Sequence, residues 1–160
     1  MRYLPDPILR SKTVTVPIRN LRDIPIQHLV YDMIESMHYY HGVGIAANQV
    51  GSRHRICIIQ RPEEDIEPIV LINPRIIRKS GYRQVTEGCL SLPGFQGKLW
   101  RSEQVWATAI GLNGEKIPFN ATEGLLAQAL EHEIDHLNGV AYIDQIEAPE
   151  DLYALDGEEE

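Results

Sequence analysis

The stretch His132-Glu133-Ile134-Asp135-His136 places two imidazoles four residues apart, with a carboxylate beside the first one. On an α-helix, residues i and i+4 share one face, so both rings can reach a single metal ion. Glu133 lies about 100° around the helix from His132, where it can serve an open position on the metal without filling it. The stretch therefore predicts a central helix on which two histidines hold an ion and its bound water, with a glutamate to take the proton.

The residues on both sides predict where this helix begins and ends. Asn120 with Glu123 three residues later has the pattern of a capping box, and Asn138-Gly139 has the pattern of a left-handed helix stop. Between them, one apolar stripe contains Leu125, Ala129, His132 and His136. Two core histidines without a ligand are the alternative, but buried imidazoles lose hydration and repel each other when both are charged. The pattern therefore favours a metal site.

The composition is typical of one ordinary globular domain. The chain has 160 residues, 43% of them hydrophobic, which is enough to bury a real core. No apolar run approaches the roughly 20 residues of a membrane span, and the first residues do not have the pattern of a signal peptide. Cys57 and Cys89 are the only cysteines; one disulfide stays open, but two cysteines without a secretory signal favour a reducing compartment. We expect a cytoplasmic protein that does not bind membranes.

The net charge of −8 is concentrated at one end of the chain. Residues 147–160 contain seven acidic residues and no Lys or Arg, whereas the remaining 146 residues carry 16 acids and 15 bases. We expect 1–146 to form the catalytic domain and 147–160 to be a short, frayed acidic tail. The chain has no basic stripe that would indicate direct binding to nucleic acid.

A second helix is predicted near the N-terminus, capped by Asp23 and carrying Pro25 in its first turn. Its apolar residues keep helical spacing up to about Tyr40, and Gly42 is expected to end it. Short strands are predicted at 13–16, 55–60, 69–72 and 104–110.

Two turns complete the pattern. Leu112-Asn113-Gly114-Glu115 predicts a type I′ hairpin, and Pro62-Glu63-Glu64-Asp65 predicts a charged connecting turn. Cys57 lies in mid-strand among isoleucines, where a packing role outweighs chemistry. Together the pattern predicts an α+β fold: antiparallel sheets of short strands packed around the central metal-binding helix, with the N-terminal amphipathic helix beside them.

Two histidines need a further protein ligand to form a catalytic metal site. The segment Glu87-Gly88-Cys89-Leu90-Ser91-Leu92-Pro93 offers Cys89, and the glycine before it allows close approach of the backbone. A buried, inert thiol is the alternative for Cys89. The segment 42–51 is dense in glycine and alanine, and its Gln49 offers two N–H donors.

Taken together, Gly-Val-Gly-Ile-Ala-Ala-Asn-Gln (42–49), Glu-Gly-Cys-Leu-Ser (87–91) and His-Glu-Ile-Asp-His (132–136) resemble the three signature motifs of the peptide deformylases, in their order. The resemblance extends from about residue 3 to residue 146, and the compact spacing is similar to that of the bacterial type I form. It implies a hydrolase that removes the formyl group from the formyl-methionine of nascent polypeptides and releases formate.

The resemblance also implies the roles of the site residues. Cys89, His132 and His136 would be the metal ligands. Glu133 would act as general base and then as general acid, while the Gln49 side chain and the Leu90 backbone N–H would stabilise the oxyanion. For the ion, the family implies Fe²⁺ in the cell, whereas coordination chemistry alone would favour Zn²⁺; Ni²⁺ and Co²⁺ also suit one thiolate and two imidazoles.

For the substrate, the resemblance implies that a formyl-methionyl nascent peptide lies as an added strand beside Gly44. The methionine pocket would be lined by Val43, Val85, Leu125 and Ala129, although ordinary core packing is the alternative for each of them. Arg101 would pair with Glu87 and brace the cysteine loop.

This chain departs from the family pattern at three places. Glu131 stands where glutamine is usual, and it should not compete with Glu133 because it lies on the opposite side of His132. Gln128 can change the polarity of the pocket. The short acidic tail replaces a longer basic helix, which argues against docking to the ribosome near its exit tunnel through this element. We expect a monomer.

Two other classes of function stay open at this stage. A metallopeptidase would use the same His-Glu-x-x-His chemistry, but neither a histidine nor a glutamate stands at a third-ligand position typical of proteases. A non-catalytic, metal-stabilised binding module is the other alternative, and Glu133 and Gln49 argue against it because a structural site has no use for a base.

Overall fold

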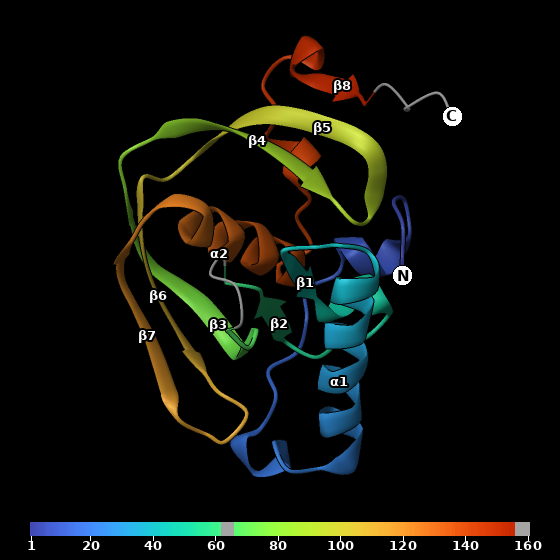
Figure 1. Ribbon diagram of the computed structural model, residues 1–160, viewed down its shortest axis with the longest axis vertical. Coiled ribbons are helices and arrows are strands. Elements are labelled where there is room, and N and C mark those ends of the chain that lie inside the picture. Colours follow the sequence, from blue (N-terminus) through green and yellow to red (C-terminus); the bar gives the residue numbers. More distant parts are fainter. Residues whose placement is uncertain (62–65, 156–160) are drawn as a thin grey trace.

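The computed structural model describes residues 1–61 and 66–155, which form two antiparallel sheets and two α-helices (Figure 1). The larger sheet has the order β1-β2-β3-β6-β7, with bounds Gly44–Ala46, Ile56–Ile59, Ile69–Ser80, Gln104–Ile110 and Lys116–Thr122. The smaller sheet has the order β4-β5-β8, with bounds Arg83–Cys89, Leu92–Arg101 and Leu152–Ala154. The predicted α+β class with antiparallel sheets is confirmed.

Helix α2, Gly124–Leu137, lies between the two sheets (Figure 1). Its apolar side packs on the larger sheet in a cluster that includes Ala127, Leu130 and Leu137. The other side faces β4 and β5 and carries both histidines, which are buried. A helix buried on both sides is held by the packing of its surroundings more than by its own propensity.

The predicted start of α2 is wrong, whereas its predicted end is confirmed. Asn120 lies in β7, which pairs with β6 up to Thr122, so the ladder hydrogen bonds of the sheet replace a helical first turn there. Glu123 is the N-cap, without a side-chain capping bond. At the other end, Asn138 is the C-cap and Gly139 has a left-handed φ of 78°.

Helix α1, Ile24–Tyr39, begins after Asp23 as predicted and buries one stripe of apolar side chains. That stripe, Ile26, Val30, Met33 and Met37, packs against the edge of the larger sheet. The left-handed residue that follows the helix is His41, with φ 55°, and not the expected Gly42. The chain then enters β1 directly, so α1 delivers the glycine-rich segment to the side of α2.

Three smaller expectations need correction. Residues 13–16 make only an isolated bridge between Val14 and His54, while the strand predicted at 69–72 continues to Ser80. The β6–β7 hairpin exists, but of its turn residues only Gly114 has a positive φ, whereas a type I′ turn needs two. The predicted turn at Pro62–Asp65 lies outside the described residues. Cys57 is fully buried in β2, as expected.

The expectation of a frayed tail is wrong for the part of it that the structure describes. The chain forms a short 3-10 turn at Pro149–Asp151 and then β8, which pairs with β5. Leu152 packs against a small core of Val85, Leu99 and Tyr142, so burial of an apolar side chain outweighs the acidic composition. Among the described helices, none has both the length and the apolar character that crossing a membrane requires.

Candidate metal centre

Three candidate ligand atoms converge where β4 meets α2. The sulfur of Cys89, at the end of β4, lies 3.1 Å from Nε2 of His136, which lies 3.2 Å from Nε2 of His132. All three donor atoms lie within 4.8 Å of one another. The i, i+4 spacing on α2 thus places both imidazoles toward the same thiol, as the sequence predicted.

The surroundings of the three donors suit a cation. Nδ1 of His132 lies 2.7 Å from Oε2 of Glu87, so the ring donates there and turns the lone pair of Nε2 toward His136. Burial disfavours a charge on His132, but hydrogen bonds to Cys89 and Glu87 outweigh it and raise the pKa of His132 well above its usual value. Burial and the neighbouring His132 lower the pKa of His136. Two imidazole nitrogens and a thiol sulfur form a donor set that fits a divalent transition metal.

Glu87 is held by the pairing with Arg101 that the sequence suggested. Nε and Nη2 of Arg101 lie 2.7 and 2.9 Å from the two carboxylate oxygens, and both side chains are buried. Burial opposes the negative charge of Glu87, but the hydrogen bonds from Arg101 and His132 lower its pKa to about 2. Arg101 also donates to Asp135 of α2 at 2.6 Å, which ties β5 to the helix.

Glu133 is buried beside the three donors, and within the described chain its Oε2 has no hydrogen-bond partner. Burial raises the pKa of Glu133 to about 7, a value suited to taking and returning a proton near neutral pH. Gly44 of β1 makes room for this carboxylate, because a Cβ there would lie 2.4 Å from Oε1 of Glu133. A larger residue at position 44 would therefore displace the carboxylate of Glu133.

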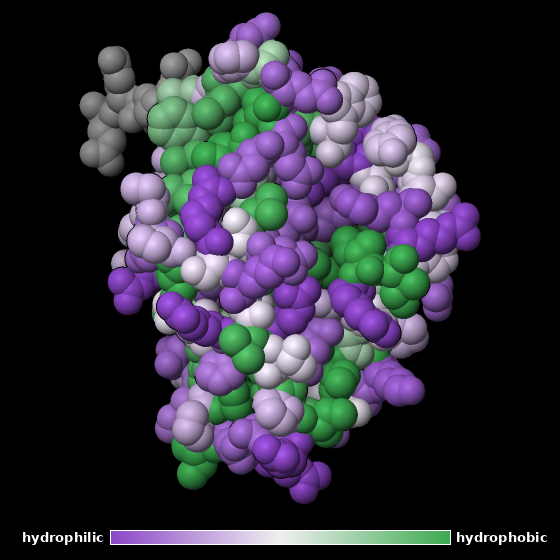
Figure 2. Space-filling view, turned by 180° about the vertical axis from the view of Figure 1, so that it is seen from behind, coloured by the Kyte–Doolittle hydropathy of each residue, from purple (hydrophilic) through white to green (hydrophobic). Residues whose placement is uncertain are grey.

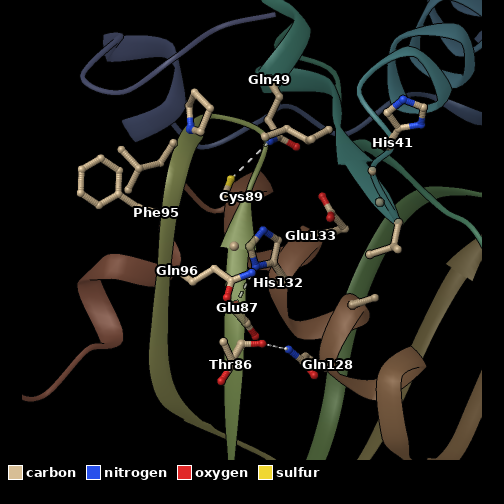
Figure 3. Close-up of a pocket in the computed structure, with 18 of the residues that line it drawn as sticks. His41, Gln49, Thr86, Glu87, Cys89, Phe95, Gln96, Gln128, His132 and Glu133 are labelled. Atoms are coloured by element: carbon tan, nitrogen blue, oxygen red, sulfur yellow. Dashed lines mark hydrogen bonds and ion pairs between the residues drawn. The ribbon is translucent and has the colours of Figure 1, made fainter. Parts of the chain in front are cut away.

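The side-chain amide of Gln49 has a fixed orientation. Its Oε1 accepts the backbone N–H of Ala46 at 2.9 Å, and its Nε2 donates to Oγ of Ser91 at 3.1 Å and to the sulfur of Cys89 at 3.6 Å (Figure 3). The side-chain N–H groups of Gln49 therefore point toward the thiol of Cys89, one of the three candidate metal ligands. Leu90 follows Cys89 and lines the cavity described next.

A cavity of about 540 Å³ opens above these groups, between β1 on one side and β4 and β5 on the other (Figure 3). The candidate substrate-binding residues that line it are Val43, Gly44, Glu87, Leu125 and Ala129. Val43 and Leu125 are about half exposed, at 54% and 47%, although both are apolar. Such exposed apolar side chains around a recess are typical of a binding pocket.

Val85 is not among the residues that line this cavity, and its assignment to the methionine site stays a prediction. It is buried with Leu99 and Tyr142 in the small core under β4 and β5. Successive residues of a strand point to opposite faces, so Val85 and Glu87 lie on the buried face of β4 and Thr86 lies on its exposed face. Thr86 and Glu87 both line the cavity.

The two unusual residues of α2 have defined contacts. Glu131 accepts the backbone N–H of Ser102 at 2.8 Å and pairs with Lys79 at 3.2 Å, so its carboxylate does not compete with Glu133, as expected. Gln128 lines the cavity and donates to the backbone oxygen of Thr86 at 3.1 Å. It therefore adds a polar group to the pocket wall.

Several residues of the site were missed in the sequence. Ser91 and Asp135 orient Gln49 and Arg101, and Tyr142 stacks on His132 with ring centroids 6.2 Å apart. Phe95 and Leu155 line the cavity from β5 and from the residue after β8. Ser91 and Asp135 lie inside the motifs and could have been suspected, whereas Tyr142 and Leu155 reach the site only through the packing of distant segments.

Comparison with known proteins agrees with this geometry. The family model described as polypeptide deformylase matches residues 1–151. The peptide deformylase of Dehalococcoides mccartyi is 45% identical over 157 residues, which cover 98% of this chain and 91% of that protein.

Two solved structures can be superposed on nearly the whole chain. The peptide deformylase of Legionella pneumophila gives a TM-score of 0.86 at 37% identity, covering 94% of this chain and 86% of that one. The class I type b peptide deformylase of Acinetobacter baumannii with bound Met-Ala-Ser gives 0.84 at 31% identity, covering 91% and 96%. From the matching fold, the family model and the level of identity together, it follows that this chain belongs to the polypeptide deformylase family.

Proposed function

We propose that this protein hydrolyses the N-formyl amide of formyl-methionine at the start of nascent polypeptides and releases formate. One observation carries the proposal: Cys89, His132 and His136 converge at the base of a peptide-sized cavity. Beside them lies a carboxylate oxygen of Glu133 that has no hydrogen-bond partner among the residues that the structure describes. Membership of the deformylase family supports this reaction, as does the peptide Met-Ala-Ser bound to the related Acinetobacter baumannii enzyme.

We infer that Cys89, His132 and His136 hold one divalent ion, with Fe²⁺ as the ion used in the cell. When bound, such an ion acidifies water and polarises the carbonyl of the scissile amide. Zn²⁺, Ni²⁺ and Co²⁺ are compatible with the same donors. The carboxylate of Glu87 keeps Nδ1 of His132 protonated, so that Nε2 is available as the ligand atom.

Glu133 accepts the proton of the attacking water on its carboxylate and later delivers that proton to the departing amine nitrogen. Its burial beside Gly44 excludes bulk water from this carboxylate. Nε2 of Gln49 and the backbone N–H of Leu90 donate to the oxygen of the formyl group as it becomes negatively charged. The contacts of Gln49 with Ala46 and Ser91 fix the amide before substrate arrives, which avoids reorganisation during the reaction.

The substrate lies in the cavity as an extended strand. β1 is the terminal strand of the larger sheet and β4 is the terminal strand of the smaller one, so both can offer backbone groups to a peptide between them. The methionine side chain then enters the apolar recess lined by Val43, Leu125 and Ala129. With the methionine side chain in that recess, we expect the formyl group to lie over the three donor atoms.

The test is release of formate from formyl-Met-Ala-Ser by protein purified without oxygen, with metal content measured on the same sample. Turnover at about one ion per chain is expected. A metallopeptidase would instead cleave internal peptide bonds without requiring a formyl group. Bound metal with no release of formate would overturn the proposal.

A further inference from the structure

The segment of residues 2–13, which we call the N-terminal strap, is hydrogen-bonded to the first two motifs of the candidate site. The backbone N–H of Arg2 donates to the backbone oxygen of Gln49 at 2.6 Å. Two residues further on, the backbone N–H of Leu4 donates to the backbone oxygen of Ser91 at 2.9 Å. The strap therefore binds the residue that carries the candidate oxyanion donor and the residue whose hydroxyl orients it.

The other end of the strap is attached to the helix that carries both histidines. The backbone N–H and the hydroxyl of Thr13 donate to the backbone oxygen of Leu137 at 2.9 and 2.8 Å, at the end of α2. A Cβ at Gly139 would lie 2.6 Å from the backbone oxygen of Arg10, so the chain after α2 packs closely on the strap. Figure 1 shows the strap, in dark blue, beside this end of α2. All three motif segments thus contact one short stretch of chain.

The strap is held in place by packing as well as by hydrogen bonds. On the face of the molecule that Figure 2 shows, hydrophilic side chains predominate and apolar side chains lie in separate groups. The strap follows the same division, because its Leu9 is buried whereas Arg2 and Arg10 are exposed. A Cβ at Gly51, the residue that ends the 3-10 helix of Gln49, would lie 3.0 Å from Nε of Arg2. The glycine therefore leaves room for the strap at this helix.

The strap bridges the two sheets at the point where the site depends on their relative position. Gln49 lies in the 3-10 helix Ala47–Val50 after β1, whereas Ser91 lies between β4 and β5. Because β1 and β4 belong to different sheets, the hydrogen bond from Gln49 to Ser91 crosses from one sheet to the other. Arg2 and Leu4 are separated by at most about 7 Å of chain, so their N–H groups hold the two backbone acceptors at a narrow range of separations.

Building on the proposed deformylase function, we propose that the N-terminal strap is a positioning element that holds the amide of Gln49 where it meets the oxygen of the formyl group. The residues that line the cavity come from other segments, so the strap acts through Gln49 and not by contact with the substrate. Misplacement of Gln49 by about 1 Å would weaken its hydrogen bond to the oxyanion, because such bonds depend steeply on distance and angle.

The experiment removes the two donors of the strap one at a time. Proline has no backbone N–H, so Arg2→Pro and Leu4→Pro each delete one hydrogen bond. With formyl-Met-Ala-Ser and the metal-loaded full chain, kcat should fall by about 10-fold while KM changes little, because a displaced oxyanion donor affects the transition state. Metal content should equal that of the unmodified chain. If Leu4→Pro does not fold, a semisynthetic chain with an ester in place of the Leu4 amide removes the same N–H without a ring.

Lys12→Pro is the matched control on the same strap. Within the described part of the chain, the backbone N–H of Lys12 has no acceptor. Ser11 before it is already extended, with φ −101° and ψ 138°, as the residue before a proline must be. The kcat of this control should equal that of the unmodified chain. An equal loss in Lys12→Pro, or an unchanged kcat in both strap variants, would overturn the proposal.

Gln49→Ala distinguishes positioning from a general loss of stability. If the strap acts through the Gln49 side chain, Leu4→Pro should cause no further loss of kcat in the Gln49→Ala background. Losses that multiply would show that the strap acts in another way, and the proposal would fail.

A measurement without substrate keeps the strap separate from the proposed reaction. In nuclear magnetic resonance spectra of the Zn²⁺-loaded chain, the side-chain amide signals of Gln49 are identified by their loss in Gln49→Ala. These signals should shift in Leu4→Pro and keep their place in Lys12→Pro; unchanged signals in Leu4→Pro would overturn the strap. If the unmodified chain binds metal but releases no formate, the deformylase function is wrong, and the amide signals still test the strap by themselves.

Discussion

Nδ1 of His132 lies 2.7 Å from the carboxylate of Glu87, and that carboxylate is held on its other side by both nitrogens of the Arg101 fork. The candidate metal ligand His132 on α2 is therefore oriented by the carboxylate of Glu87 on β4, which in turn is oriented by Arg101 on β5. Such hydrogen-bonded partners of a ligand fix its ring and its tautomer. The orientation of this candidate ligand thus depends on a buried ion pair between two strands of the smaller sheet.

Arg101→Ala removes the guanidinium group that pairs with Glu87 and Asp135. The unfolding free energy should fall by about 3–5 kcal/mol, because Glu87 and Asp135 would be left without their cation. Metal affinity should fall by about 10- to 100-fold, because His132 loses its oriented partner. Chemical denaturation and metal content after dialysis measure the two effects. Arg101→Lys should lie in between, since it keeps the charge without the fork; unchanged metal retention in Arg101→Ala would contradict the brace.

Glu133→Gln separates the roles of base and ligand. We expect the variant to retain its metal and to lose formate release by about 10²–10⁴-fold, since glutamine cannot accept the proton. Metal content and the steady-state rate of formate release, measured on the same preparation, distinguish the two roles. If the variant loses its metal, Glu133 is a ligand of the ion. If the variant keeps its rate of formate release, Glu133 is not the general base.

Gly44→Ala tests the close approach of β1 to Glu133. The new methyl group would lie 2.4 Å from Oε1, so the carboxylate must move, and the rate should fall by about 10²-fold. The matched control is Gly88→Ala, in which the nearest atom would be 3.5 Å away. The ratio of the two rates measures the steric effect. Equal rates would show that the carboxylate tolerates the displacement.

Removal of the metal should lower both activity and stability. An ion present at 100 times its dissociation constant contributes about 2.7 kcal/mol to the unfolding free energy, and a chelator should abolish this contribution. Fe²⁺, Ni²⁺, Co²⁺ or Zn²⁺ added back should restore the melting temperature. His136→Ala lacks one of the three donors, so its melting temperature should respond to neither treatment. A response equal to that of the unmodified chain would place the ion elsewhere.

Local spacing explains why the convergence of the candidate ligands could be predicted from the sequence. His132 and His136 are one helical turn apart, and Glu133 is their neighbour, so their relative positions follow from helix geometry alone. Cys89 was then predicted as the third ligand because its thiol, which follows Glu87-Gly88, can coordinate a metal ion. In the structure these donor atoms do converge.

The errors arose where distant segments decide the outcome. Asn120 has a capping sequence, but pairing with β6 keeps it in β7. The acidic end of the chain forms strand β8 because it pairs with β5 and because Leu152 packs into a small core. The amino-acid composition of this segment does not predict the pairing or the packing.

The site draws its parts from two layers of the fold: Cys89, Glu87 and Arg101 from the smaller sheet, and both histidines with Asp135 from α2. Any fluctuation that lifts β4 and β5 away from α2 therefore takes the thiol from the imidazoles and breaks the contact of Arg101 with Asp135 in the same movement. We expect bound metal to oppose that opening and to protect the amides of β4 and β5 from hydrogen exchange. An ion held by these three donors would join the two layers of the fold, so we expect loss of the metal and local opening of the smaller sheet to occur together.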